Sequence, residues 1–158
     1  MPESYTFSNT SPLLYLHLIN QLDLLPQLYG TVHIPPAVDA ELQAGAERGV
    51  DVPRVPALSW LQIMPLASAH SIPIVMDLGR GEAEVIALGL EYPDSRLILD
   101  DTLARRIARL QALRITGTVG VVVKAKQSGL LPTVAPILSA LREAGLWLSD
   151  RLVADVLH

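Results

Sequence analysis

Short apolar segments alternate with longer amphipathic ones along most of this chain, in the order typical of strands followed by helices. Strands are predicted at residues 4–8, 31–34, 60–64, 96–99 and 114–116. Helices are predicted at residues 12–19, 23–29, 35–48, 79–92, 102–113 and 117–127, with two more between residues 132 and 157. Because strands and helices alternate, the pattern predicts a single α/β domain over residues 1–158, a three-layer α/β/α sandwich with a central, mostly parallel sheet.

The composition agrees with a packed interior. Hydrophobic residues make up 50% of the 158 residues and charged residues 18%, which excludes a disordered chain. The absence of cysteine excludes disulfides and cysteine-ligated metal sites. No signal-like N-terminus and no long apolar run is present, so we expect a soluble, cytoplasmic protein with no membrane partner. The mean hydropathy of +0.36 favours self-association, such as a homodimer.

The net charge of −4 argues at first against a nucleic-acid partner. However, half of the twelve basic residues lie between Thr102 and Lys126, a stretch without any acidic residue. These residues are Arg105, Arg106, Arg109, Arg114, Lys124 and Lys126. The cluster is either an ordinary solvated helix face or a surface that follows a phosphate backbone, and the sequence leaves both interpretations open.

Polar residues stand at two predicted strand ends, where parallel sheets bind their ligands. Asn9 closes the first strand, although a turn residue would also account for it. Asp100 and Asp101 directly follow the strand at residues 96–99. Only one of these two aspartates can cap the helix that follows, so we expect the other carboxylate at the mouth of the sheet.

Helical phase selects two glutamates as inward-facing. At 100° per residue, Glu41 shares a stripe with apolar residues and Glu47 points the other way. Glu82 is expected to point inward in the same manner, whereas Glu84 is expected to face solvent. An internal salt bridge would also explain Glu41, and a favourable helix dipole would also explain Glu82.

Together, one amide and at least three carboxylates are predicted to converge on one edge of the sheet. Like charges so close together raise one another's pKa and repel. A hard divalent cation removes this penalty, and Mg²⁺ or Mn²⁺ takes carboxylate and water oxygens as ligands. Such a centre can activate water for phosphodiester cleavage.

Five blocks of sequence occur in a familiar order, and with them the chain resembles the PIN-like domain family. The resemblance is to the branch catalogued as a domain of unknown function and related to VapC-type toxin ribonucleases, and it covers residues 5–157. The blocks are SNTSPL at residues 8–13, IPPAVDAEL at 34–42, GRGEAEVIAL at 79–88, LILDD at 97–101 and TGTVG at 116–120.

The resemblance implies a Mg²⁺- or Mn²⁺-dependent endoribonuclease fold, often the toxin of a toxin–antitoxin pair. Position by position, the acidic quartet of the family falls on Asn9, Glu41, Glu82 and Asp101, with Asp100 beside the last. A supporting hydroxyl is implied at Thr10 or Ser11. Ser11, Arg105, Arg106 and Lys124 are the expected contacts to RNA.

This sequence departs from the general PIN pattern at its first acid, which is the amide Asn9 here. Two hypotheses therefore follow from the sequence. In the first, Glu41, Glu82 and Asp101 hold the metal, Asn9 and Asp100 assist, and the protein cleaves RNA. In the second, the domain binds RNA or a protein partner, such as a cognate antitoxin, without cleaving.

Overall fold

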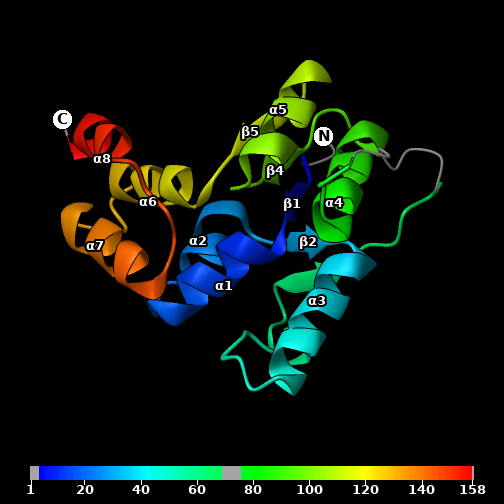
Figure 1. The fold of residues 1–158 in the computed structure, drawn as a ribbon, viewed down its shortest axis with the longest axis horizontal. Coiled ribbons are helices and arrows are strands. Elements are labelled where there is room, and N and C mark those ends of the chain that lie inside the picture. The colour runs from blue at the N-terminus through cyan, green and yellow to red at the C-terminus, as the bar shows by residue number, and fades with distance from the viewer. Residues whose placement is uncertain (1–3, 69–75, 158) are drawn as a thin grey trace.

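The computed structural model describes residues 4–68 and 76–157 and is built on a five-stranded, all-parallel sheet (Figure 1). The order across the sheet is β3-β2-β1-β4-β5. The strands are β1 (Thr6–Ser8), β2 (Val32–Ile34), β3 (Leu61–Ile63), β4 (Arg96–Ile98) and β5 (Arg114–Thr116). All five predicted strands are present, and all except β5 are shorter than predicted.

The helices cover both faces of the sheet. They are α1 (Thr10–Leu18), α2 (Leu24–Tyr29), α3 (Pro36–Glu47), α4 (Arg80–Glu91), α5 (Thr102–Leu110), α6 (Thr118–Gln127), α7 (Ala135–Ala144) and α8 (Asp150–Leu157), with a 3-10 turn at Val55–Ala57. Helix α4 packs on β1 and β4 and contacts α5, whereas α6 packs with α1 and α2. Figure 1 shows the strands between these two groups, so the predicted α/β/α sandwich is confirmed.

Two predicted helix boundaries are wrong. The sequence predicts a helix at residues 12–19 with Ser11 as its N-cap, but helix α1 begins at Thr10 and Asn9 occupies the N-cap position. Pro12 is tolerated there because the first turn of a helix has no intrahelical partner for its N–H groups. Helix α5 ends at Leu110, three residues early, because the chain turns through a left-handed conformation at Ala112 (φ 59°).

The strand order brings the ends of β1 and β4 together. From β1 the chain moves outward through β2 to β3, and then returns through α4 to β4 on the other side of β1. The sheet order therefore reverses between β1 and β4, which is where doubly wound sheets bind ligands. The pairing continues past β1, since the Asn9 N–H donates to the Ile98 carbonyl at 3.1 Å.

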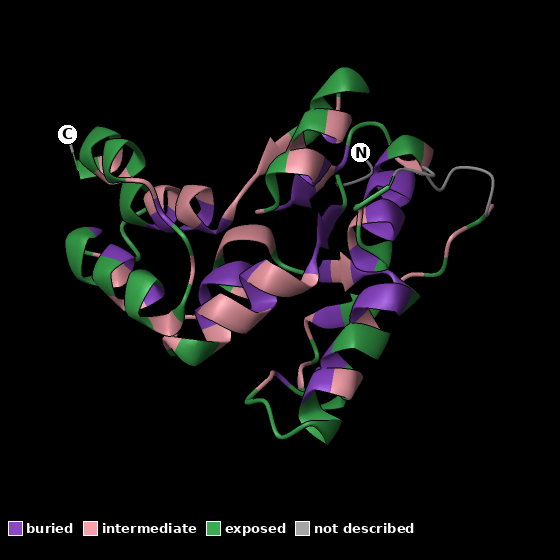
Figure 2. Ribbon diagram, in the orientation of Figure 1, coloured by how far each residue is buried: buried purple, intermediate pink, exposed green. Residues whose placement is uncertain are grey.

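Helix α4 is the most buried helix of the described chain, whereas α7 and α8 are largely exposed (Figure 2). The prediction that Glu84 faces solvent is wrong, because its side chain is buried. Glu84 accepts hydrogen bonds from the Ala37 N–H at 3.0 Å and from Arg80 Nε at 3.2 Å. Helical phase failed here because α3, α5 and the sheet surround α4, so it has no single apolar face.

No helix within the described residues is both long enough and apolar enough to cross a membrane. The segment at residues 67–78 was expected to be irregular, and its residues 69–75 lie outside the described part of the chain.

Removing the Glu84 carboxylate should destabilise the fold. In Glu84→Ala the Ala37 N–H loses its partner in a buried place, which costs about 1–3 kcal/mol. Urea unfolding followed by circular dichroism would measure this loss. The matched control is Glu47→Ala at the exposed end of α3, where we expect a change within about 0.5 kcal/mol. Equal effects of the two substitutions would contradict the structural role of Glu84.

Candidate metal centre

Asn9 lies at the switch in strand order, and one atom of its side chain, Oδ1, has no partner in the described part of the chain. It stands at the N-cap of α1 but makes no capping hydrogen bond through its side chain. Its Nδ2 donates to Glu82 Oε1 at 3.5 Å, so Oδ1 is the amide atom that does not contact Glu82 through this hydrogen bond. Asn9 is only 5% exposed, and its Oδ1 has no hydrogen-bond partner in the described part of the chain. A buried carbonyl oxygen without a donor is costly, and a cation would satisfy it.

Glu82 lies in the first turn of α4, beside Asn9. Its Oε2 accepts the Gly79 N–H at 2.7 Å, so the position of Glu82 at the start of the helix accounts for one of its two carboxylate oxygens. Its other oxygen faces the amide of Asn9. Burial raises the pKa of the Glu82 carboxyl, the Gly79 N–H opposes this, and the charges of Asp101 and Glu41 raise that pKa further. Three carboxylates therefore share one electrostatic environment.

Glu41 approaches from α3. Its neighbours on the predicted stripe, Val38 and Leu42, are buried, but Glu41 itself is exposed, so the prediction that its side chain faces inward is wrong. Its carboxylate accepts the hydroxyl of Thr10 and the N–H of Gly81, the latter at 3.1 Å. The salt bridge to an arginine that the sequence allowed is not among the ion pairs of the described residues.

The aspartate pair after β4 is divided between two tasks. Asp101 caps α5 by accepting the Ala104 N–H at 2.9 Å, and its charge acts on Glu82. Asp100 instead accepts three hydrogen bonds, from Ser11 Oγ (2.9 Å), the Thr118 N–H (2.7 Å) and the Thr118 hydroxyl (2.6 Å). This matches the expectation that one aspartate caps the helix and the other lies at the mouth of the sheet.

Two glycines leave room for these carboxylates. A Cβ at Gly81 would lie 2.7 Å from Glu41 Oε1, and a Cβ at Gly117 would lie 2.9 Å from Asp100 Oδ1. Contacts this short do not occur between real side chains, so any larger residue would displace a carboxylate. The glycines of two sequence blocks, residues 79–88 and 116–120, thus permit close approach of the acids.

The donor set fits a partly hydrated Mg²⁺ or Mn²⁺. Within residues 4–68 and 76–157, no three acidic or histidine side chains converge tightly enough to coordinate one ion by themselves. Magnesium does not require three protein ligands, because it keeps several waters and binds through one or two carboxylates. Asn9 Oδ1 and the Glu82 carboxylate would supply direct ligands, while Glu41 and Asp101 add negative charge nearby.

A cavity of about 800 Å³, here called the basic pocket, adjoins Asp100. Two of the expected RNA contacts, Arg105 and Lys124, line it, whereas Arg106 is exposed elsewhere on α5. Arg105 also donates to the Leu99 carbonyl at 2.8 Å, which fixes its position beside the strand end. The fourth expected contact, Ser11, binds Asp100 instead of lining the pocket.

Three residues of this region were missed by sequence analysis. Arg96 and Trp147 line the basic pocket, and Thr118 holds Asp100 through both its N–H and its hydroxyl. The block at residues 116–120 was a usable signal for Thr118, because it had the composition of a phosphate-binding turn. No sequence pattern links Trp147 to Arg96, since these two residues come to the same pocket only in the folded chain.

The raised pKa of Glu82 gives the metal-free protein a defined pH dependence. A carboxyl whose pKa is raised on folding costs stability when it is charged, so this cost is fully present above the folded-state pKa and disappears as the pH falls through it. Glu82→Gln should therefore raise Tm at pH 7 in EDTA, with a difference that shrinks in acid. Thermal scans between pH 4 and about 8 would measure it. Glu47→Gln controls for the loss of one surface charge, and a constant difference across this range would contradict the assignment.

Comparison with known proteins agrees with this geometry. A family model described as “DUF3368: PIN domain” matches residues 6–158, and no curated protein matches the chain significantly. The match spans nearly the whole sequence, including all five blocks that carried the resemblance. It therefore confirms that this chain belongs to the PIN domain family.

Proposed function

We propose that this protein is an endoribonuclease that depends on Mg²⁺ or Mn²⁺. The observation that carries the proposal is the buried, unpartnered Oδ1 of Asn9, whose amide faces the carboxylate of Glu82 through Nδ2 at the switch in strand order. Membership of the PIN family supports a nuclease-type activity, divalent metal and RNA as the ligand. The basic pocket next to Asp100 gives an acidic chain a local surface for phosphates.

Each residue of the centre has a task in this proposal. Asn9 and Glu82 would hold the cation, with Glu41 and Asp101 adding negative charge nearby, and the cation when bound would supply an activated water and neutralise charge on the phosphodiester. Thr10 orients Glu41 through a hydrogen bond.

On the other side of the centre, Ser11 and Thr118 orient Asp100. Arg105 and Lys124 would bind phosphates of the strand next to the scissile bond, and Arg106 would add a more distant positive charge.

The proposal extends to partners in the same way. Toxin nucleases of this family pair with an antitoxin protein, and the exposed apolar residues Leu152 and Leu157 of α8 favour contact with a partner or with a second copy of the chain. A neighbouring reading frame that encodes a small protein would support the toxin assignment, and sedimentation would establish whether the chain is a homodimer.

Removing either glutamate should abolish metal-dependent cleavage. Glu41→Gln and Glu82→Gln keep the size of the side chain and remove one charge each, so we expect kcat to fall by about 10²-fold or more. Cleavage of a labelled single-stranded RNA with Mn²⁺, and with EDTA as the blank, measures this.

The matched control for that experiment is Glu47→Gln, at the exposed end of the helix that carries Glu41. It should cleave at the wild-type rate. Unchanged cleavage in both active-centre variants would exclude the proposed mechanism.

One observation favours a second candidate function, a PIN module that binds RNA without cleaving. Asn9 provides one neutral oxygen where an aspartate would provide a negative charge, so metal affinity is reduced. Calorimetric titration with Mn²⁺ separates the two functions. Under the nuclease proposal the wild type binds Mn²⁺, and Asn9→Asp tightens binding by about tenfold. If only Asn9→Asp binds at millimolar Mn²⁺, the non-cleaving module is the correct assignment.

A further inference from the structure

The basic pocket extends well beyond the candidate metal centre. It is lined by residues of edge strand β5, of helices α5, α6 and α8, and of the segment at residues 146–148. Figure 1 shows α8 beside α6, on the far side from α5. Arg96, at the start of β4, and Asp100, after its end, both line the pocket. Four residues of extended chain cover about 13 Å, so the pocket is longer than a single phosphate group.

The lining carries a positive charge that the described chain does not neutralise. Arg96, Arg105, Arg109 and Lys124 line the pocket, and Asp100 is its one acidic residue. None of these four cations takes part in a salt bridge within the described residues. Burial lowers the pKa of Lys124, and the like charges of two arginines on β4 and β5 lower it further. An anionic ligand would relieve this repulsion.

Tyr29 fixes two of these cations at the wall of the pocket. The Arg96 guanidinium carbon lies 5.3 Å from the centre of the Tyr29 ring, and the Lys124 ammonium nitrogen lies 4.5 Å from it. Both distances are within the range of cation–π attraction. The two cations are thus held in place before any ligand arrives, which lowers the entropic cost of binding a phosphate.

The segment between α7 and α8 presents a large aromatic ring of the pocket lining to solvent. Trp147 lies between α7 and α8 and is 81% exposed, although the next residue, Leu148, is buried and anchors the segment. An exposed indole on an anchored segment is a suitable platform for stacking a nucleic-acid base. In a duplex only the terminal base pairs have a free face for such stacking, so the ring favours single strands.

We propose that the basic pocket is a binding subsite for single-stranded RNA. Phosphates of the strand lie on Arg96, Lys124 and Arg109, an unpaired base stacks on Trp147, and the strand leads past Asp100 to the acidic centre. The inference deepens the proposed function and rests on it for the choice of RNA as the ligand. Trp147 is here a binding residue and has no part in the cleavage step.

The test uses the fluorescence of Trp147 in the full chain without metal. Trp60, the other tryptophan, directly precedes β3 at the opposite edge of the sheet, so Trp60→Phe leaves Trp147 as the reporter. Titration in EDTA with a single-stranded RNA of about eight nucleotides should quench this fluorescence. An RNA duplex of the same length should quench it much less. No quenching, or equal quenching by the duplex, would overturn the proposal.

Variants separate stacking from charge. With a dye-labelled RNA, Trp147→Ala should weaken binding about tenfold or more, and Trp147→Phe should restore part of the loss. Lys124→Gln should weaken binding and reduce the slope of log K against log salt by about 0.7.

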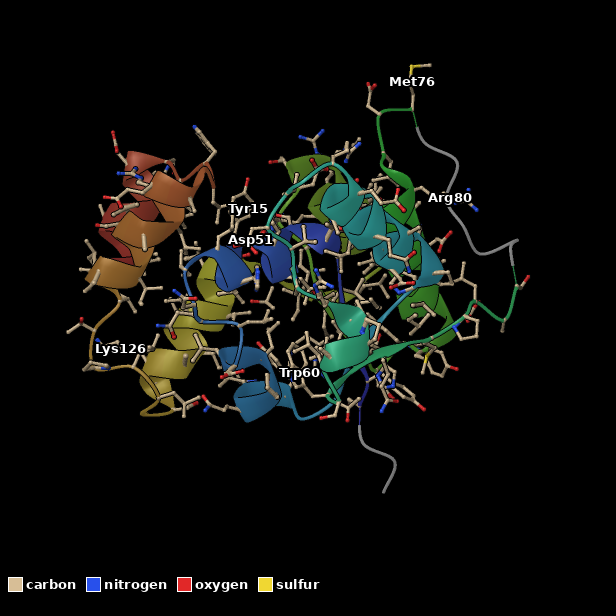
Figure 3. All side chains as sticks on the ribbon, turned by 90° about the horizontal axis from the view of Figure 1, so that it is seen from below. Tyr15, Asp51, Trp60, Met76, Arg80 and Lys126 are labelled. Atoms are coloured by element: carbon tan, nitrogen blue, oxygen red, sulfur yellow. The ribbon has the colours of Figure 1, made fainter. Side chains whose placement is uncertain are left out.

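The matched control is Lys126→Gln, since Lys126 lies at the outer end of the same helix and does not line the pocket (Figure 3). It should change affinity less than twofold. Equal effects of the two lysine substitutions would mean that RNA affinity depends only on the net charge of the protein, and would overturn the subsite.

The outcomes also distinguish this inference from the proposed function. Binding with quenching in EDTA, but no cleavage with Mn²⁺, would remove the nuclease and leave the subsite. Cleavage by Trp147→Ala with an unchanged KM would remove the subsite and leave the nuclease. If Trp147→Ala abolishes self-association in sedimentation without changing RNA affinity, the pocket is a protein interface and the inference is wrong.

Discussion

The parallel pairing of β1 with β4 is the contact on which the candidate site depends. Ser8 pairs with Ile98 in the sheet, and the N–H of the next residue, Asn9, donates to the Ile98 carbonyl at 3.1 Å. The segments that leave these two strands therefore run side by side, and each begins with side chains that can bind a cation. A slip of one residue in this register would move Asp100 by about 3.3 Å, which exceeds the length of any hydrogen bond that now holds it.

That pairing brings several carboxylates together, and the donors that bind these carboxylates matter as much as their number. The carboxylates bind neutral donors, namely three hydroxyls, of Thr10, Ser11 and Thr118, and the N–H groups at the starts of helices. Within the described residues, neither Glu41 nor Glu82 forms a salt bridge. Neutral donors orient a carboxylate without cancelling its charge, so the centre keeps its attraction for a cation.

Buried Glu84, two residues from Glu82, shows the contrast. It binds both a backbone N–H and Arg80, and it serves the packing of α4 on α3. The two glutamates lie only two positions apart on one helix, but their hydrogen-bond partners differ. Glu84 is therefore a structural carboxylate, whereas Glu82 remains available to a ligand.

The sequence predicts the structure best where a local pattern determines the outcome. The alternation of short apolar segments with amphipathic ones located all five strands. The ends of two of these strands identified Asn9, Asp100 and Asp101 as neighbours. It failed where the environment is set by segments far apart in the chain. Helical phase assigns one face of a helix to solvent, so it misplaced Glu84 on a helix that is enclosed on several sides. Ser11 was expected to cap a helix, but its hydroxyl donates instead to Asp100, which follows β4.

The same distinction resolves the conflict between an acidic chain and an RNA ligand. Charges beyond about 8 Å are largely screened at physiological salt, so a phosphate responds to its immediate surroundings. The acids cluster around Asn9 at the starts of α1 and α4, whereas the cations line the pocket along β5. Gly117 lies at the boundary, because a Cβ there would touch both Asp100 Oδ1 at 2.9 Å and Arg105 Nη1 at 3.0 Å. Under the proposed function, a strand that crosses this boundary would pass from cations that bind its phosphates to acids that hold a metal, so a net charge of −4 does not exclude RNA.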